Sequence, residues 1–181
     1  EESLETKAIS LIGRKLYEKF IRGYTIKQWN KDPIDLPSSI ISRLPVRFNL
    51  NSDYFDAPFQ GVPLHGYGEM FSKLLSHENI EVMLNTDFAQ VKDKINPSAK
   101  IIYTGMIDEY FGYKYGNLEW RSLKFENEIL ENEDNYQGNA VVNYTSHDQA
   151  YTRIIEHKHF EFNKCKGTII TKEYPMNWKL G

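Results

Sequence analysis

The spacing of the apolar residues changes along this chain of 181 residues, and this change restricts the possible fold more than any other feature. Between residues 6 and 23 the apolar side chains recur every three or four positions, which places them on one face of a helix. These side chains are Ile9, Ile12, Leu16 and Phe20. From Leu118 onward the pattern becomes that of short strands with polar connections. We therefore expect an α+β fold, with a helical N-terminal part followed by a mostly antiparallel sheet.

Glycine and proline mark where the expected helices end. Gly23 is expected to end the first helix, because glycine most easily takes the left-handed conformation of a helix C-terminus. Residues 24–29 then begin a second, short helix. Three prolines lie between residues 32 and 45, so this stretch cannot form one long helix. We expect an ordered loop with a helical turn from Ser38.

The remaining elements complete a division of the chain into three parts. Helices are expected at residues 67–75 and 108–115, and short strands at 80–84 and 100–103. The sheet is expected to consist of strands 118–129, 140–145, 151–162 and 168–174. The three parts are then a mainly helical part (1–78), a mixed segment (79–116) and an antiparallel sheet (117–181).

Charge and cysteine content exclude several classes of protein. Lys and Arg number 22 and Asp and Glu 25, so the net charge of −3 lacks the basic excess that a nucleic-acid backbone requires. The single cysteine, Cys165, excludes an internal disulfide and a cysteine-rich zinc site. No apolar run approaches the roughly 20 residues that cross a bilayer, and the acidic start is unlike a signal peptide. We expect a cytoplasmic protein that binds neither nucleic acid nor a membrane.

Searches for nucleotide-binding and metal-binding motifs are negative. Gly66 and Gly68 form a G-x-G pair, but Phe71 stands where the third glycine of a dinucleotide fingerprint belongs, and no P-loop is present. His157 and His159 are expected on one face of a strand. Because no third ligand has a recognisable spacing, half-buried strand histidines explain them better than a metal site.

Arginines among apolar neighbours give the clearest chemical signal. In the expected strands, Arg121 shares a face with Leu123 and Phe125, and Arg153 shares one with Ile155. A guanidinium on an apolar face needs a partner, because an unpaired buried charge is costly. Two interpretations remain open: a structural ion pair with a carboxylate of the chain, or an anionic ligand such as phosphate, which suits the planar fork of arginine.

Aromatic residues near the end of the first helix add to this signal. Phe20 and Tyr24 lie four residues apart, and Trp29 follows. Packing in the core explains them as well as stacking on a ligand ring does. Arg43, taken alone, is typical of a solvated loop charge. Together these residues suit a nucleotide diphosphate, with its ring stacked and its phosphates held by guanidinium groups.

Several segments resemble UDP-galactopyranose mutase of the bacterial type, in order over essentially the whole chain. They are residues 24–29, 103–108, 120–123, 137–145 and 151–160. The last two segments are long and unusual, so the resemblance is specific. It implies that the chain is part of a larger flavoenzyme fold, in which residues 1–78 contribute to substrate binding and residues 79–116 to the flavin domain.

The resemblance implies a reaction and its cofactor. The family is an isomerase that interconverts UDP-galactopyranose and UDP-galactofuranose, the precursor of galactofuranose in cell wall biosynthesis. It requires FAD in the reduced form and proceeds through an adduct between flavin N5 and the sugar. UDP-galactose is the implied partner, and a homodimer is considered for the full-length protein.

The resemblance also implies roles for individual residues. The implied substrate-binding residues are Phe20, Tyr24, Thr25, Trp29, Arg43, Tyr54, Asn143 and Arg153. Tyr24 would stack on uracil, and Arg43 would lie on a mobile loop that closes on the diphosphate. The implied catalytic residues are Arg43, Arg121 and Arg153. Gly105 and Arg121 would lie beside the flavin, with no metal involved.

The family's main FAD-binding glycine motif is absent from this sequence. We therefore expect a central fragment of the enzyme that is inactive alone. The alternative is a non-catalytic module that binds a nucleotide sugar. A different flavin oxidoreductase has less support, because residues 24–29 and Arg43 suit UDP and not an amine.

Overall fold

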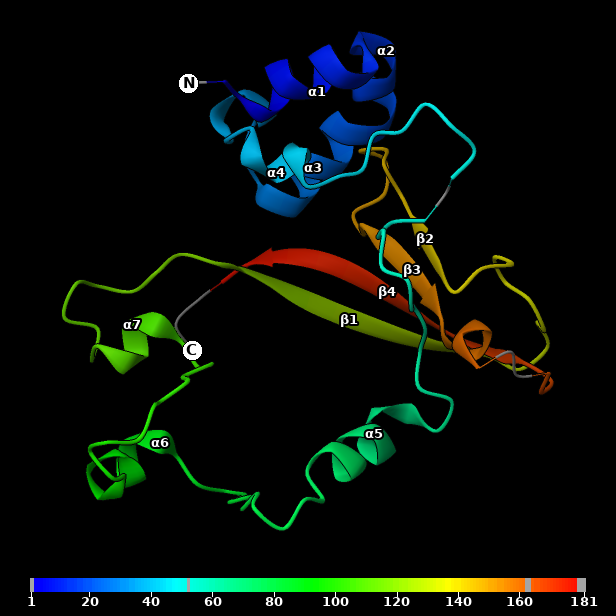
Figure 1. The fold of residues 1–181 in the computed structure, drawn as a ribbon. Coiled ribbons are helices and arrows are strands. Elements are labelled where there is room, and N and C mark those ends of the chain that lie inside the picture. Colours follow the sequence, from blue (N-terminus) through cyan, green and yellow to red (C-terminus); the bar gives the residue numbers. More distant parts are fainter. Residues whose placement is uncertain (1, 52, 162–163, 179–181) are drawn as a thin grey trace. The chain divides into compact units, whose positions relative to one another are not determined.

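The computed structural model describes residues 2–51, 53–161 and 164–178 (Figure 1). Internal contacts divide the chain into two units, Glu1–Gln60 with Glu119–Gly181, and Gly61–Leu118. The first unit holds helices and a four-stranded antiparallel sheet, so the α+β fold is confirmed. The three-part division expected from the sequence stays a prediction.

The first unit begins with a series of short helical elements. In chain order they are α1 (Leu4–Ile12), α2 (Arg14–Leu16), the π-helix η1 (Tyr17–Arg22), α3 (Gly23–Trp29), the 3-10 helix η2 (Pro33–Asp35) and α4 (Ser39–Ser42). The second short helix and the helical turn after Ser38 are confirmed by α3 and α4.

The expected single helix over residues 6–23 is wrong in its bounds. Ser3 caps α1 in a reciprocal box, in which its side chain accepts from the Thr6 amide at 3.2 Å and the Thr6 hydroxyl accepts from the Ser3 amide at 3.0 Å. Gly13 then takes a left-handed φ of 77° and ends α1. Leu16 and Phe20 lie beyond this break and stay 48% and 47% exposed, so the predicted apolar face is not one buried face.

The core of this helical part includes side chains from α1, η1 and the proline-rich stretch. Its buried members are Leu4, Ala8, Tyr17, Leu36 and Ile41. The Leu4 amide donates to the Leu36 carbonyl at 2.8 Å, and the Tyr17 hydroxyl donates to the Glu5 carboxylate at 2.8 Å. The proline-rich stretch is therefore packed on α1 over part of its length.

The sheet consists of β1 (Arg121–Leu130), β2 (Val141–Asn143), β3 (Arg153–Glu156) and β4 (Thr168–Asn177), in the order β1-β4-β3-β2. Arg153 is opposite Asn143 on one side and Glu173 on the other, so these three residues share one face. The expected strand over residues 151–162 is wrong after Glu156. His157 and His159 lie in the 3-10 helix η4 (His157–Phe160) and not on a strand face.

The second unit contains α5 (Gly66–Leu74), α6 (Phe88–Val91), the 3-10 helix η3 (Lys92–Lys94) and α7 (Ile107–Tyr110). The expected helix at 67–75 is confirmed, and the one at 108–115 is shorter than predicted. The rings of Phe88, Tyr103 and Tyr110 form a small aromatic cluster. The strands expected at 80–84 and 100–103 are wrong: neither pairs with a described strand, and a strand needs a neighbour for its backbone hydrogen bonds.

Within the described ranges, no helix is long and apolar enough to cross a membrane.

A buried carboxylate, Glu156, ties β3 to the loop before β2. It accepts hydrogen bonds from the amides of Tyr136 and Gln137, at 3.0 and 2.9 Å, and from the Thr168 hydroxyl at 2.8 Å. His159 Nε2 lies 3.1 Å from the same carboxylate. Burial opposes ionisation, but these donors outweigh it and lower the pKa of Glu156.

We predict that Glu156→Gln lowers stability and removes part of its dependence on acid pH. Because the pKa of Glu156 is lower in the folded state, its contribution is present above the unfolded pKa of about 4.3 and is lost as the pH falls through the folded pKa. Each backbone donor left without an acceptor costs about 1–3 kcal/mol. Urea unfolding of the full-length protein between pH 3 and 7 measures both effects. The exposed Glu133→Gln is the control, and equal pH profiles for the two variants would contradict the prediction.

Candidate functional site

A cavity of about 330 Å³ lies between α3, α4 and the ends of β2 and β3 that adjoin them. Its lining includes every substrate-binding residue implied by the sequence resemblance. The other lining residues are Leu4, Ile21, Gln28, Ile40, Ile41, Leu44 and Thr145. The volume falls at the lower end of the ~300–1,000 Å³ typical of small-molecule sites. The structure thus brings together implied substrate-binding residues that are up to 133 positions apart, from Phe20 to Arg153.

The passage from η1 into α3 explains how one helical segment supplies much of the lining. The lining residues of this segment recur in adjacent pairs every four positions: Phe20 and Ile21, Tyr24 and Thr25, Gln28 and Trp29. Positions four apart lie on one side of a helix, and η1 continues into α3 without a break. Phe20 therefore lies on the same side as Tyr24.

Arg153 connects the sheet wall of the cavity to the helical wall. Its Nη2 donates to the Tyr24 hydroxyl at 2.9 Å, and its Nε lies 3.4 Å from Glu173 Oε1, a contact between opposite charges. Burial opposes its charge, but the hydrogen bond to Tyr24 and the carboxylate of Glu173 together raise the pKa of Arg153. The structural ion pair considered from the sequence is therefore present, on a guanidinium that also lines the cavity.

Arg43 and Tyr54 line the cavity from the segment after α3. Arg43 follows α4 directly and is exposed. Tyr54 lies in a loop held by Arg47, which donates to the Asp53 carbonyl and pairs with the Asp56 carboxylate at 2.7 Å. Arg47 was missed by sequence reasoning, although the acidic residues on both sides of Tyr54 offered a signal.

Arg121 lies in a neighbouring hollow of about 460 Å³ and does not line the first cavity. Its Nε donates to the Gln28 carbonyl at 3.0 Å and its Nη2 to the Lys27 carbonyl at 3.4 Å, both at the end of α3. A further hydrogen bond joins it to Asn177. All three tryptophans of the chain line this hollow: Trp29, Trp120 and Trp178. Trp29 lines both spaces, so the two are adjacent.

The hollow around Arg121 has the chemistry that a flavin ring requires. Indole rings offer flat apolar walls, with Trp120 and Trp178 at 5.4 Å between centroids, and a guanidinium can offset negative charge on the ring. Gly105 lies in the other unit, where the side chain of Tyr103 fills the space beside it. The residues around Arg121 therefore fit a flavin, whereas the proximity of Gly105 to a flavin stays a prediction.

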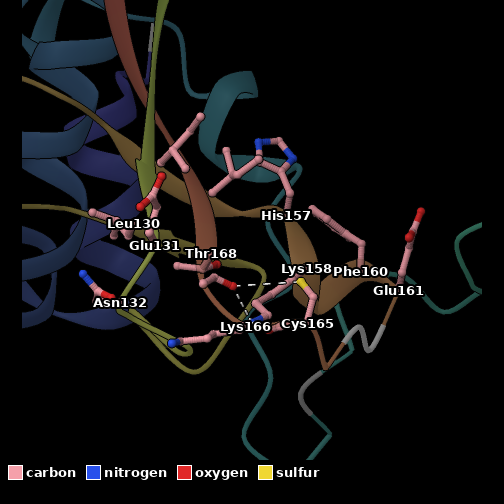
Figure 2. Close-up of a pocket in the computed structure, with 13 residues that line it drawn as sticks. Leu130, Glu131, Asn132, His157, Lys158, Phe160, Glu161, Cys165, Lys166 and Thr168 are labelled. Atoms are coloured by element: carbon pink, nitrogen blue, oxygen red, sulfur yellow. Dashed lines mark hydrogen bonds between the residues drawn. The ribbon is translucent and has the colours of Figure 1, made fainter.

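A larger hollow, of about 720 Å³, lies where β1 ends and β4 begins (Figure 2). Its Lys158 ammonium donates to the carbonyls of Cys165, Gly167 and Asp134, at 2.7, 2.8 and 2.9 Å. These bonds use all three donors of Lys158, so it has none left for a ligand. Much of the remaining lining is apolar, with Ile129, Phe160 and Ile169. Among the described residues no group of three or more His, Cys, Asp or Glu could hold a metal ion.

Sequence reasoning missed Gln28 and Thr145 as lining residues. Both lie within the segments that carry the resemblance, 24–29 and 137–145, so the segments themselves were the available signal. It also misread Gly23, which has a helical φ of −63° and does not end a helix. A β-carbon at Gly23 would lie 2.5 Å from the Thr145 carbonyl oxygen. Glycine is needed there because α3 passes close to the backbone that follows β2.

We predict that Gly23→Ala destabilises the protein by about 1–3 kcal/mol, the usual effect of overpacking. The added methyl group meets backbone and not a flexible side chain, so α3 or Thr145 must move. Gly68→Ala is the matched control, because Gly68 also lies in a helix and has open space around it. There alanine should be neutral or stabilising. Equal changes in the urea midpoint would contradict this explanation of Gly23.

Comparison with known proteins gives a consistent family. The sequence profile of the GLF family, described as UDP-galactopyranose mutase, matches residues 19–181. A probable UDP-galactopyranose mutase of Klebsiella pneumoniae is 43% identical over 96% of the chain. A dTDP-fucopyranose mutase of Escherichia coli is 39% identical over 96%, and a UDP-galactopyranose mutase of Mycoplasma pneumoniae is 31% identical over 87%.

The chain spans about half the length of these relatives, namely 44%, 47% and 42%. The matched region contains the candidate cavity except for Leu4. Because the family profile matches most of its length, this chain belongs to the UDP-galactopyranose mutase family.

Proposed function

We propose that this chain is the nucleotide-sugar-binding portion of a flavin-dependent isomerase that interconverts UDP-galactopyranose and UDP-galactofuranose. The observation that carries the proposal is a cavity lined by aromatic rings and two guanidinium groups, in a chain of this family. UDP-galactose is the proposed substrate, cell-wall galactofuranose the proposed use and the cytoplasm the proposed location. The single cysteine is consistent with a reducing compartment.

In this proposal the aromatic part of the cavity binds the uridine. Tyr24 stacks on uracil, with Phe20 and Thr25 beside it. Tyr24 is suited to this because its hydroxyl is held by Arg153 at 2.9 Å, which restricts the ring before a ligand arrives. Asn143, at the end of β2, and Thr145, which follows it, offer polar contacts from the sheet side of the cavity.

The diphosphate is proposed to bind between Arg43 and Arg153. Negative charge on UDP increases as the bond to the anomeric carbon breaks, so cations held at the diphosphate stabilise the transition state. Arg153 is fixed by Glu173 and Tyr24, whereas Arg43 is exposed at the end of α4. We propose that Arg153 binds the diphosphate in place and that Arg43 closes over it.

Reduced FAD, when bound, would supply the nucleophilic nitrogen that such an isomerisation needs. Arg121, Trp29 and Trp120 would lie beside its ring, by the fit described above. Arg121 is already fixed by the carbonyls of α3, so its charge can offset the negative charge of the reduced ring without reorganisation.

Turnover by the full-length protein tests the proposal. With reduced FAD, we expect the protein to convert UDP-galactofuranose to UDP-galactopyranose. Chromatography of the nucleotide sugars measures this conversion. Binding of UDP without any turnover would support instead the non-catalytic module. Absence of both binding and turnover would overturn the proposal.

A second candidate is a mutase for dTDP-fucopyranose. It is favoured by one observation, the 39% identity to the Escherichia coli enzyme of that name, close to the 43% to the Klebsiella pneumoniae relative. The same turnover assay, run with dTDP-fucopyranose, distinguishes the candidates. We expect higher kcat/KM for the UDP sugar, and the reverse order would favour the second candidate.

We predict that Arg43→Ala lowers kcat/KM by roughly 10²–10³-fold, the scale for removing one donor that stabilises transition-state charge. Arg43→Lys should recover only part of the loss, because an ammonium keeps the charge but not the planar fork.

Arg14→Ala is the control for Arg43→Ala. Arg14 lies in α2, is exposed and contacts the exposed Glu18 at 3.9 Å, so its loss should leave kcat/KM unchanged. Equal losses of kcat/KM in the two variants, or no loss in Arg43→Ala, would contradict the proposal and show that Arg43 is a solvated loop charge.

A further inference from the structure

Lys27 extends from α3 to the connection between β2 and β3. Its Nζ donates to the Tyr144 carbonyl at 2.6 Å and to the Tyr151 carbonyl at 2.9 Å. The side chain is partly buried, and this burial lowers the pKa of Lys27. Over residues 2–51, 53–161 and 164–178, no carboxylate lies within ion-pair distance of it. Among the described residues, backbone oxygens are therefore the groups that compensate for the charge of Lys27.

The two carbonyls are close in sequence to residues of the candidate cavity. Tyr144 stands between Asn143 and Thr145, and Tyr151 stands two residues before Arg153. Asn143, Thr145 and Arg153 all line the cavity. Lys27 thus holds both strand ends from which the sheet wall of the cavity is built.

The same helix supplies much of the opposite wall. Tyr24, Thr25, Gln28 and Trp29 line the cavity, whereas Lys27 does not. Its side chain reaches from α3 to the hairpin without entering the cavity. A change at Lys27 therefore alters the relation between the two walls and removes no group that would touch a ligand.

We infer that Lys27 is a positioning residue, which holds the β2–β3 connection against α3 so that both walls of the cavity contact one nucleotide. This inference rests on the proposed function. Hydrogen bonds from a charged donor are stronger than neutral ones, and their loss leaves two partly buried carbonyls without this partner. The hairpin then moves relative to α3, and ligand contacts from Asn143 and Arg153 weaken.

Lys27→Met in the full-length protein tests the inference, because it keeps the apolar stem and removes both hydrogen bonds. Calorimetry with UDP should show a Kd about tenfold higher, because part of the free energy lost with the two hydrogen bonds appears as weaker binding. KM should rise with Kd while kcat changes less, because binding of the ground state is affected. Lys27→Arg, which can still donate to both carbonyls, should restore most of the affinity. Lys15→Met, at an exposed position of α2, should leave Kd unchanged.

A double mutant separates positioning from general stability. In an Arg153→Ala background, Lys27→Met should raise Kd less than in the wild type, because the hairpin has then lost a contact that Lys27 orients. A merely structural Lys27 would lower Tm in both backgrounds and leave Kd the same at temperatures well below Tm. That result, or equal increases in Kd in both backgrounds, would overturn the inference. If Lys27→Met does not fold, the milder Lys27→Gln should show a smaller rise in Kd, and an unchanged Kd would again overturn it.

The outcomes for Lys27 and for the proposed function can be distinguished. If Arg153→Ala weakens UDP binding but Lys27→Met does not, the proposed site stands and the inference fails. If the wild-type protein does not bind UDP, the proposed function fails and the inference fails with it.

Discussion

The charge of Arg153, on an inner strand of the sheet, requires partners that determine much of the surrounding structure. Taking a guanidinium out of water is costly unless opposite charge and hydrogen bonds compensate for it. Glu173 provides the charge from β4, and the Tyr24 hydroxyl accepts a hydrogen bond on α3. Two features are therefore coupled. They are the pairing of β3 with β4, which puts Arg153 opposite Glu173, and the face of α3 that contacts the sheet. The candidate cavity is the space that remains between these partners, and Lys27 and Gly23 act at the same junction from α3.

Local pattern was enough to predict the sheet but not where every element ends. The alternation in β1 and β4 and the helical turn after Ser38 are properties of short segments, and these predictions held. The strand expected to reach residue 162 ends at Glu156, whose carboxylate is bound by amides some 20 residues earlier in the chain. Gly23 was misread for a similar reason. A glycine permits both a left-handed turn and a close backbone contact, and only the tertiary structure shows which of these is used.

The lining residues of the candidate site were predictable in part, and the contacts of the residues that were missed explain why they were missed. Spacing left two interpretations of Arg153 open, and the observed contacts are compatible with both, since the ion-paired guanidinium also lines the cavity. The resemblance named lining residues but not Lys27 or Arg47. Lys27 acts on backbone carbonyls, and every residue has a carbonyl, so no residue type in the partner segment marks its contacts. The partners of Arg47 include the Asp56 carboxylate, but the spacing alone does not show that the two side chains meet. The placement of Arg121 in a separate hollow with three tryptophans likewise depends on the fold.

Relatives of similar identity carry names with different nucleotide sugars, so membership of the family does not by itself select the nucleotide or the sugar. The proposed function requires that the cavity between α3 and the ends of β2 and β3 bind a nucleoside diphosphate. A crystal structure of the full-length protein with UDP measures this most directly. We expect the uracil ring against Tyr24 and the diphosphate within hydrogen-bond distance of Arg153. UDP bound elsewhere, with no contact to Tyr24 or Arg153, would contradict it.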